Sequence, residues 1–117
     1  MAMHDDVDQR REAKRASLAA KKEKAERDAA VSLLLTSPQG RRYLYWILEV
    51  SGAVGVNPFS SDSLVTAFRC GEQNIGQQVM AHIIDVSPEG FMTMLIEREN
   101  ERKLQVEKET SDEDAAG

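Results

Sequence analysis

The chain has a single cysteine and few aromatic residues, and both scarcities limit what it can be. One cysteine, Cys70, in 117 residues excludes an internal disulfide and any site built from several cysteines. Aromatic residues make up 5% of the chain, and the one Trp and both Tyr residues fall between Tyr43 and Trp46. No window approaches about 18 continuous apolar residues, and the N-terminus has no basic segment before an apolar run. We therefore expect neither a membrane-spanning helix nor a signal peptide.

The chain also lacks an excess of positive charge. It has 15 Lys and Arg against 20 Asp and Glu, which gives a formal net charge of −5. A general nucleic-acid binder carries a basic stripe and a high isoelectric point. The basic clusters near the N-terminus are interleaved with acidic residues and lack the aromatic residues that stack on bases. Nucleic-acid binding is therefore disfavoured.

Apolar residues are unevenly distributed, and they divide the chain into four segments. Residues 1–30 are predicted to form a charged helical arm, 31–97 a compact helical core and 98–109 a charged helical extension. The acidic residues 110–117 are expected to be disordered. The core is shorter than the ~70–80 residues at which a lone hydrophobic core is comfortably stable. We therefore expect the chain to rely on a partner.

Helix formers and capping residues predict an all-α fold. Residues 5–35 are rich in Ala, Lys, Glu and Arg and contain neither Gly nor Pro. Ser37–Pro38 and Ser87–Pro88 each offer an N-cap serine followed by proline at the first helical position. A third helix begins after residues 60–62 and continues through Gly71, with or without a short break. We expect a small bundle of about four to five helices, with a long charged N-terminal helix and a C-terminal helical extension.

The large apolar side chains are the predicted core. The segment that contains Trp46 carries apolar residues around much of its helix. Gly76 lies inside another helix, where glycine costs about 1 kcal/mol relative to alanine. A close approach of this helix to the helix that contains Trp46 would explain why glycine stands at position 76. The predicted core anchors are Tyr43, Tyr45, Trp46, Phe59, Phe68, Ile75 and Phe91.

No pattern of residues points to an active site. The only histidines are His4 and His82, and His82 is interpreted as a boundary histidine at the edge of an apolar face. Cys70 is interpreted as a buried, inert thiol. The chain has no His-x-x-x-His or Gly-x-Ser-x-Gly motif. We expect a protein that is not an enzyme and binds no metal and no cofactor.

Exposed basic residues are the predicted partner contacts. Arg41 and Arg42 occupy the first turn of a helix, where positive charge opposes the helix dipole. They are therefore expected either to pair with carboxylates or to face a partner. The N-terminal arm is interpreted as a solvated helix, with docking on a partner or contact of its basic clusters with nucleic acid as the alternatives. The predicted contact residues are Arg41, Arg42, Arg10, Arg11, Lys14 and Arg15.

The predicted core carries an ordered series of motifs. The series is Ser37-Pro38-x-Gly40-Arg41-Arg42-Tyr43-Leu44, Leu48-Glu49, Phe59, Thr66-Ala67-Phe68, Gly71 and Asn74-Ile75-Gly76. It resembles a family of small virion-associated proteins of short-tailed bacteriophages, typified by one encoded among the structural genes of a Bordetella phage. The resemblance covers about Leu35 to Glu97. The family usually carries an arginine between Gly71 and Gly76, whereas Glu72 and Gln73 stand there in this chain.

The resemblance implies a non-enzymatic component of a phage particle. We expect a virion protein that docks on the portal or tail-adaptor region at the head–tail junction, or that is packaged in the head. Its expected partners are other virion proteins, and a homo-oligomer is also open. Its expected location is the host cytoplasm during assembly and then the virion. A phage assembly factor or an ejected internal protein is the alternative, and a DNA-binding regulator comes third.

Overall fold

The structure is a computed structural model that describes residues 2–55 and 57–116, without the side chains of residues 2–4 and 116. Within these residues the chain forms four helices and no strand, so the predicted all-α class is confirmed. The helices are α1 (Ala2–Leu35), α2 (Pro38–Val50), α3 (Ser63–Val86) and α4 (Pro88–Ala116).

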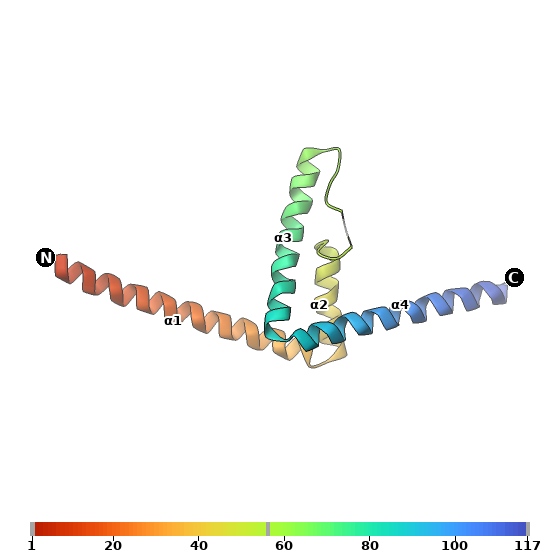
Figure 1. Cartoon of the computed structure of the whole chain (residues 1–117), viewed down its shortest axis with the longest axis horizontal. Coiled ribbons are helices and arrows are strands. Elements are labelled where there is room, and N and C mark those ends of the chain that lie inside the picture. The colour runs from red at the N-terminus through yellow and green to blue at the C-terminus, as the bar shows by residue number, and fades with distance from the viewer. Residues whose placement is uncertain (1, 56, 117) are drawn as a thin grey trace.

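The four helices form a flat, branched molecule. Helices α1 and α4 run outward in opposite directions from a shared junction, and α2 and α3 stand up from it as an antiparallel hairpin (Figure 1). The molecule measures 88 × 41 × 16 Å along its principal axes. A single helix with its side chains is about 10–12 Å across. The shortest dimension therefore leaves room for little more than one layer of helices.

Capping residues begin the helices where the sequence predicts them. The Ser37 hydroxyl accepts a hydrogen bond from the Gly40 N–H at 3.1 Å, and the Ser87 hydroxyl accepts one from the Gly90 N–H at 2.9 Å. Each bond satisfies one of the backbone donors that a helix leaves unpaired at its start. The Asp62 carboxylate caps α3 in the same way. These predicted helix starts are confirmed.

Two glycines allow the helices to meet closely. A Cβ atom at Gly76 would lie 2.7 Å from the Ser51 Cβ and 2.8 Å from the Ala53 Cβ, both just after α2. A Cβ atom at Gly40 would lie 2.7 Å from the carbonyl carbon of Leu34 in α1. The close approach predicted for Gly76 is therefore present, and it involves the end of α2.

Two long helices continue further than the sequence suggested. Helix α3 passes through Gly71 without a break, and α4 continues to Ala116. The prediction of disorder over 110–117 is therefore wrong for residues 110–116, and residue 117 lies outside the described residues. After Gly90 the chain has neither Gly nor Pro before its last residue, and Glu, Lys and Ala favour helix. Nothing in this stretch stops α4.

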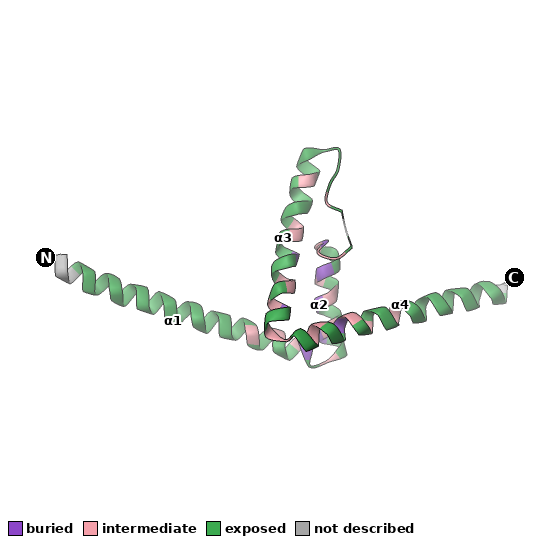
Figure 2. Ribbon diagram, viewed as in Figure 1, coloured by how far each residue is buried: buried purple, intermediate pink, exposed green. Residues whose placement is uncertain are grey.

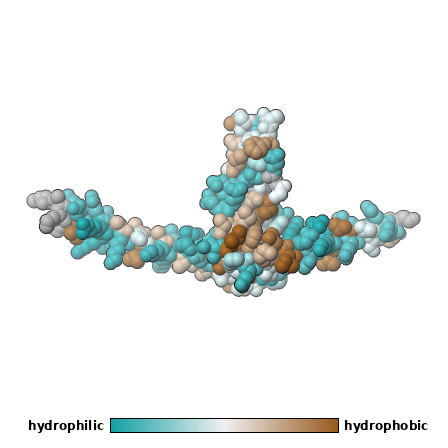
Figure 3. All heavy atoms as spheres, in the orientation of Figure 1, coloured by the Kyte–Doolittle hydropathy of each residue, from teal (hydrophilic) through white to brown (hydrophobic). Residues whose placement is uncertain are grey.

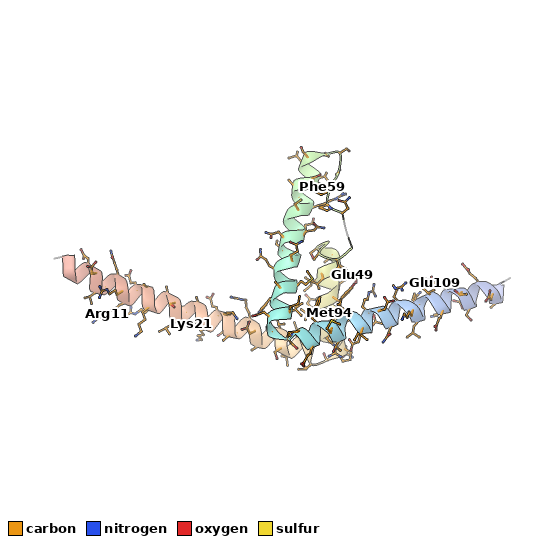
Figure 4. All side chains as sticks on the ribbon, viewed as in Figure 1. Arg11, Lys21, Glu49, Phe59, Met94 and Glu109 are labelled. Carbon is orange, nitrogen blue, oxygen red and sulfur yellow. The ribbon has the colours of Figure 1, made fainter. Side chains whose placement is uncertain are left out.

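The hydrophobic core lies at the junction and is small. Every helix contributes to it, and the buried residues lie from the foot of the hairpin up to the end of α2 and at the adjoining ends of α1 and α4 (Figure 2). Met94 of α4 lies at this foot (Figure 4). The fully buried side chains are Leu48, Ile83 and Met94. The other buried core residues are Leu35 and Leu44.

Most of the predicted core anchors do not lie in this core. Tyr45 and Phe91 are half-buried and pack against it. The prediction is wrong for five others, because the hairpin is one layer thick and no described helix covers its outer part. Phe59 lies near the far end of the hairpin (Figure 4). The exposed residues are Tyr43, Trp46, Phe59, Phe68 and Ile75.

Candidate interaction surface

The described side chains that could act in catalysis or bind a metal do not lie together in one site. Among the described residues no three His, Cys, Asp or Glu side chains are placed to hold a metal ion together. Cys70 is exposed, so its interpretation as a buried thiol is wrong. It lies on a side of α3 that is turned away from the contact of Gly76 with α2. His82 is half-buried beside Asp28, as a boundary histidine should be.

Asp28 links α1 to α3. One carboxylate oxygen lies 2.7 Å from the His82 Nε2, and the other accepts a hydrogen bond from the Lys24 ammonium at 2.9 Å. Lys24 also lies 3.7 Å from the Asp85 carboxylate of α3. The hydrogen bonds from Lys24 and then from His82 hold the pKa of Asp28 below its ordinary value. This cluster connects the last third of α1 to the end of α3.

Arg41 and Arg42 both pair with carboxylates of α4. Arg41 donates to Glu97, and its guanidinium also donates to the Leu35 carbonyl oxygen at 2.7 Å. Its side chain is 13% exposed. Arg42 pairs with Glu101 at 2.7 Å from a more exposed position. The structure therefore shows the carboxylate pairing that the sequence left open. A role for either arginine in contacting a partner stays a prediction.

The other predicted contact residues lie on the outer part of α1. Arg11 projects from this arm (Figure 4). All four side chains are exposed, and none forms an ion pair with another described residue. Their role in partner binding also stays a prediction. They are Arg10, Arg11, Lys14 and Arg15.

An apolar stripe lies on the exposed side of α2. Tyr43, Trp46 and Val50 follow one another at spacings of three and four residues, which places them on one side of the helix. The Tyr43 and Trp46 rings contact each other with centroids 5.8 Å apart. Trp46 nevertheless keeps 54% of its surface exposed. No other described helix covers the exposed part of this stripe.

A second apolar stripe follows α3. Leu64, Phe68 and Ile75 are spaced by four and seven residues and so share one side of this helix. Phe68 is 70% exposed and Ile75 is 64% exposed. Gly71 lies on the same side between them, and a Cβ atom there would meet nothing within 4 Å. This stripe also lacks a covering element in the described chain.

The α2 stripe lies between the sides that α1 and α4 approach. Tyr43 is three residues after Gly40, which contacts Leu34 of α1. Trp46 is four residues after Arg42 and three before Glu49, and these two residues contact Glu101 and Arg98 of α4.

The α3 stripe lies on the side that α1 approaches. Ile75 is seven residues before His82, which contacts Asp28 of α1, and Phe68 is seven residues before Ile75. We call the exposed residues of the two stripes together the hairpin face. It consists of Tyr43, Trp46, Val50, Leu64, Phe68 and Ile75.

Charged residues border the hairpin face. Glu72 lies four residues after Phe68 and three before Ile75, and Val50 lines a pocket with Glu49, Arg69 and Glu72. Uncharged residues on the same sides of the two helices are Ile47, Gly71 and Gln78. By contrast, the surfaces of α1 and α4 are largely hydrophilic in the view of Figure 3, whereas apolar atoms gather around the hairpin and the junction. At the foot of the face, α1 and α3 enclose an open groove of about 320 Å³. It is lined by Lys24, Arg27, Gln78, Val79 and His82.

No single helix in the described part of the chain is both long and apolar enough to cross a membrane. Taken together, α3 and α4 meet that test by length and composition alone, with a bend of 118° between them. Comparison of the chain with protein-family models, curated proteins and solved structures gave no match. The resemblance to the phage family therefore stays a prediction.

Proposed function

We propose that the protein is a non-enzymatic structural protein that works as part of a larger assembly, a bacteriophage virion. The observation that carries this proposal is its surface. The chain exposes 9106 Å², whereas a compact monomer of 13.0 kDa exposes about 6,300 Å². An excess of about 2,800 Å² is more than a standard protein interface removes from one partner, which is about 800 Å². Such a surface suits a chain that is covered by other proteins.

The two outward helices add to this argument. A polar helix that projects from a small core gains little stability from its own chain, because most helical stability in proteins comes from packing an apolar face. Helices α1 and α4 give the molecule its 88 Å length. They therefore suit contacts with distant parts of a large particle. Exposed and unpaired basic residues on α1, Arg10, Arg11, Lys14 and Arg15, are the proposed contacts with acidic surfaces of other virion proteins.

The phage setting rests on the resemblance of residues 35–97 to virion-associated proteins. On that basis the protein docks on the portal or tail-adaptor region or is packaged in the head. An assembly factor or ejected internal protein is the second candidate. The small core of five buried residues favours it, because a marginally stable chain is easily released or threaded.

Quantitative mass spectrometry of mature particles and precursor heads tests this proposal, using the phage that encodes the chain. A fixed copy number in mature particles, matching the ring symmetry of the portal, is the expected result for a protein of the head–tail junction. An irregular copy number indicates packaged cargo. Presence in precursor heads alone indicates an assembly factor. Absence from both overturns the proposal, and DNA affinity with a steep salt dependence would then support a regulator.

A further inference from the structure

Basic residues gather on one side of the outer part of α1. Leu18 is 56% exposed, and each of its neighbours on the helix surface, three and four residues away in either direction, is basic. Val7, further out and also exposed, is followed at the same spacings by two arginines. The acidic residues of this stretch lie at the edge of that side, as Asp8 and Glu26 do, or on other sides of the helix. We call this side the basic face, and it consists of Val7, Arg10, Arg11, Lys14, Arg15, Leu18, Lys21 and Lys22.

The outer part of α4 carries the opposite charge. Residues 107–114 contain five acidic residues and one lysine. Val106 is 49% exposed, and Glu109 and then Glu113 follow it at spacings of three and four residues on one side of the helix. In the described part of α4 the last turn has no basic residue, so no positive side chain there offsets the negative end of the helix dipole beside these carboxylates. A basic helix alongside would stabilise this segment. We call Val106, Glu109 and Glu113 the acidic face.

The two faces lie at matching distances from the junction, on arms that run outward in opposite directions (Figure 1). Leu18 is 17 residues before the end of α1 at Leu35, and Val106 is 18 residues after the start of α4 at Pro88. At a rise of about 1.5 Å per residue, each lies about 26 Å from the inner end of its helix. A rotation of 180° about an axis that passes through the junction and across the arms therefore brings α1 of one copy level with α4 of another.

The charges match in the same register. Arg11 and Lys14 lie seven and four residues outward from Leu18. Glu113 and Glu109 lie seven and three residues outward from Val106. When Leu18 of one copy is level with Val106 of another, these basic and acidic side chains are therefore level with each other.

We propose that the basic face of α1 binds the acidic face of α4 in a second copy of this chain, in a two-fold symmetric pair. The symmetry forms two such contacts at once, because α1 of each copy lies against α4 of the other. The inference names one acidic surface for the contact role that we proposed above for the basic residues of α1. It rests on that role and does not depend on the phage setting.

The composition of the basic face favours an acidic helix over nucleic acid or a membrane. Contacts with a phosphate backbone use charged and polar groups, so Leu18 at the centre of the face would gain nothing from them. A lipid interface requires a broad apolar side, whereas this face has two apolar residues and no aromatic residue. An acidic helix with an exposed apolar residue beside its carboxylates matches both parts of the face.

Sedimentation velocity of the purified full-length chain at low ionic strength tests the inference, with a reducing agent present because Cys70 is exposed. The chain should sediment as a monomer of 13.0 kDa at high dilution and as a species of twice that mass at higher concentration. Added salt should return the pair to monomers, because it screens exposed charges. This experiment uses the isolated chain, so its result is independent of whether the chain occurs in phage particles.

Two outcomes of that experiment overturn the proposal. One is a chain that stays monomeric at every concentration, and binding of that monomer to duplex DNA or to vesicles of anionic lipid would then assign the basic face to that ligand. The other is a series of species that grows beyond twice the monomer mass, because a closed two-fold pair cannot add further copies.

An exchange of charges between the arms identifies the contact. One double variant carries Arg11→Glu with Lys14→Glu, and the other carries Glu109→Lys with Glu113→Lys. Each alone should associate at least tenfold more weakly than wild type. An equal mixture of the two should pair with nearly the wild-type affinity, because the reversed charges of one variant then face those of the other. A mixture that stays monomeric, or a double variant that pairs as the wild type does, overturns the proposal.

Arg27→Glu is the matched control for Lys14→Glu. Arg27 is exposed, and it lies nine residues from Leu18, on the opposite side of α1. Its charge reversal should leave association unchanged, whereas Lys14→Glu should weaken association. The helical circular dichroism of the diluted variants should match that of the wild type, because both side chains are exposed in the single chain. Equal weakening by the two substitutions overturns the proposal, because a general effect of net charge would then explain the association.

Discussion

The guanidinium group of Arg41 binds the carboxylate of Glu97, 56 positions later in the chain. The Arg41 Nε–H donates to Glu97 Oε2 at 2.9 Å, and the Nη2 group donates to Oε1 at 2.5 Å. Its third nitrogen donates to the carbonyl oxygen of Leu35 at 2.7 Å. One side chain therefore joins the end of α1, the start of α2 and the body of α4. This planar fork is a geometry that lysine cannot reproduce.

Replacing Arg41 by lysine should lower the urea midpoint of unfolding, because the positive charge stays but the paired hydrogen bonds are lost. The matched control is Arg42→Lys. The Arg42 side chain is 67% exposed and makes one hydrogen bond to Glu101, so its replacement should leave the midpoint unchanged. Equal urea midpoints for wild type and Arg41→Lys would show that the paired hydrogen bonds of Arg41 do not stabilise the junction of the helices.

Stability should fall in acid because the carboxylates of the junction are paired. The hydrogen bond from Arg41 lowers the pKa of Glu97 below its ordinary 4.5. Stability linked to a lowered pKa is fully present above the unfolded value and is lost as the pH falls through the folded value. The pKa of Asp28 is shifted in the same direction by Lys24 and His82.

Urea unfolding of wild type and Glu97→Gln from pH 7 to pH 3 measures this effect. The wild type should be more stable at pH 7, and the difference should shrink below about pH 4.5 as Glu97 takes up its proton. A difference that stays constant across the whole range would mean that Glu97 does not contribute through its charge.

Two glycines of α3 should respond to alanine with opposite signs. Gly71→Ala should raise the free energy of unfolding by about 1 kcal/mol, because alanine favours helix and its Cβ meets nothing within 4 Å. Gly76→Ala should lower it by about 1–3 kcal/mol, because its Cβ would lie 2.8 Å from the Ala53 Cβ. Chemical denaturation in dilute solution measures both free energies of unfolding. If both change with the same sign, the close α2–α3 contact at Gly76 is wrong.

The core should tolerate little loss of volume. Leu48 is fully buried, and its replacement by alanine should cost about 2–5 kcal/mol, enough to abolish cooperative unfolding of a core with five buried residues. Leu33→Ala is the matched control, since Leu33 is an exposed leucine of α1 close to the same junction. Thermal unfolding followed by circular dichroism distinguishes the two. A cooperative transition near the wild-type temperature in Leu48→Ala would contradict the core described above.

The helices were predictable from the sequence because their signals are local. Ser37–Pro38 and Ser87–Pro88 determine two helix starts through side chains that reach only three residues along the chain. The close contact at Gly76 was also predictable, because glycine inside a helix needs a packing reason.

The arrangement of the helices and the position of the core were not predictable in the same way. Trp46 and Phe68 repeat at helical spacing just as Leu48 and Ile83 do, and periodicity identifies an apolar side without identifying what covers it. Only the relative placement of four helices shows that one set is buried by this chain and the other is not. The pairing of Arg41 with Glu97 depends on that placement too.

Trp46 provides the most direct test of the central claim, that the core is confined to the five buried residues and leaves the apolar residues of the hairpin face exposed in the single chain. It is the only Trp of the chain, it is 54% exposed, and its ring contacts Tyr43 on the hairpin face. Quenching of its fluorescence by acrylamide should be strong in the purified single chain. A Trp46 that is shielded from acrylamide in the single chain would contradict the account.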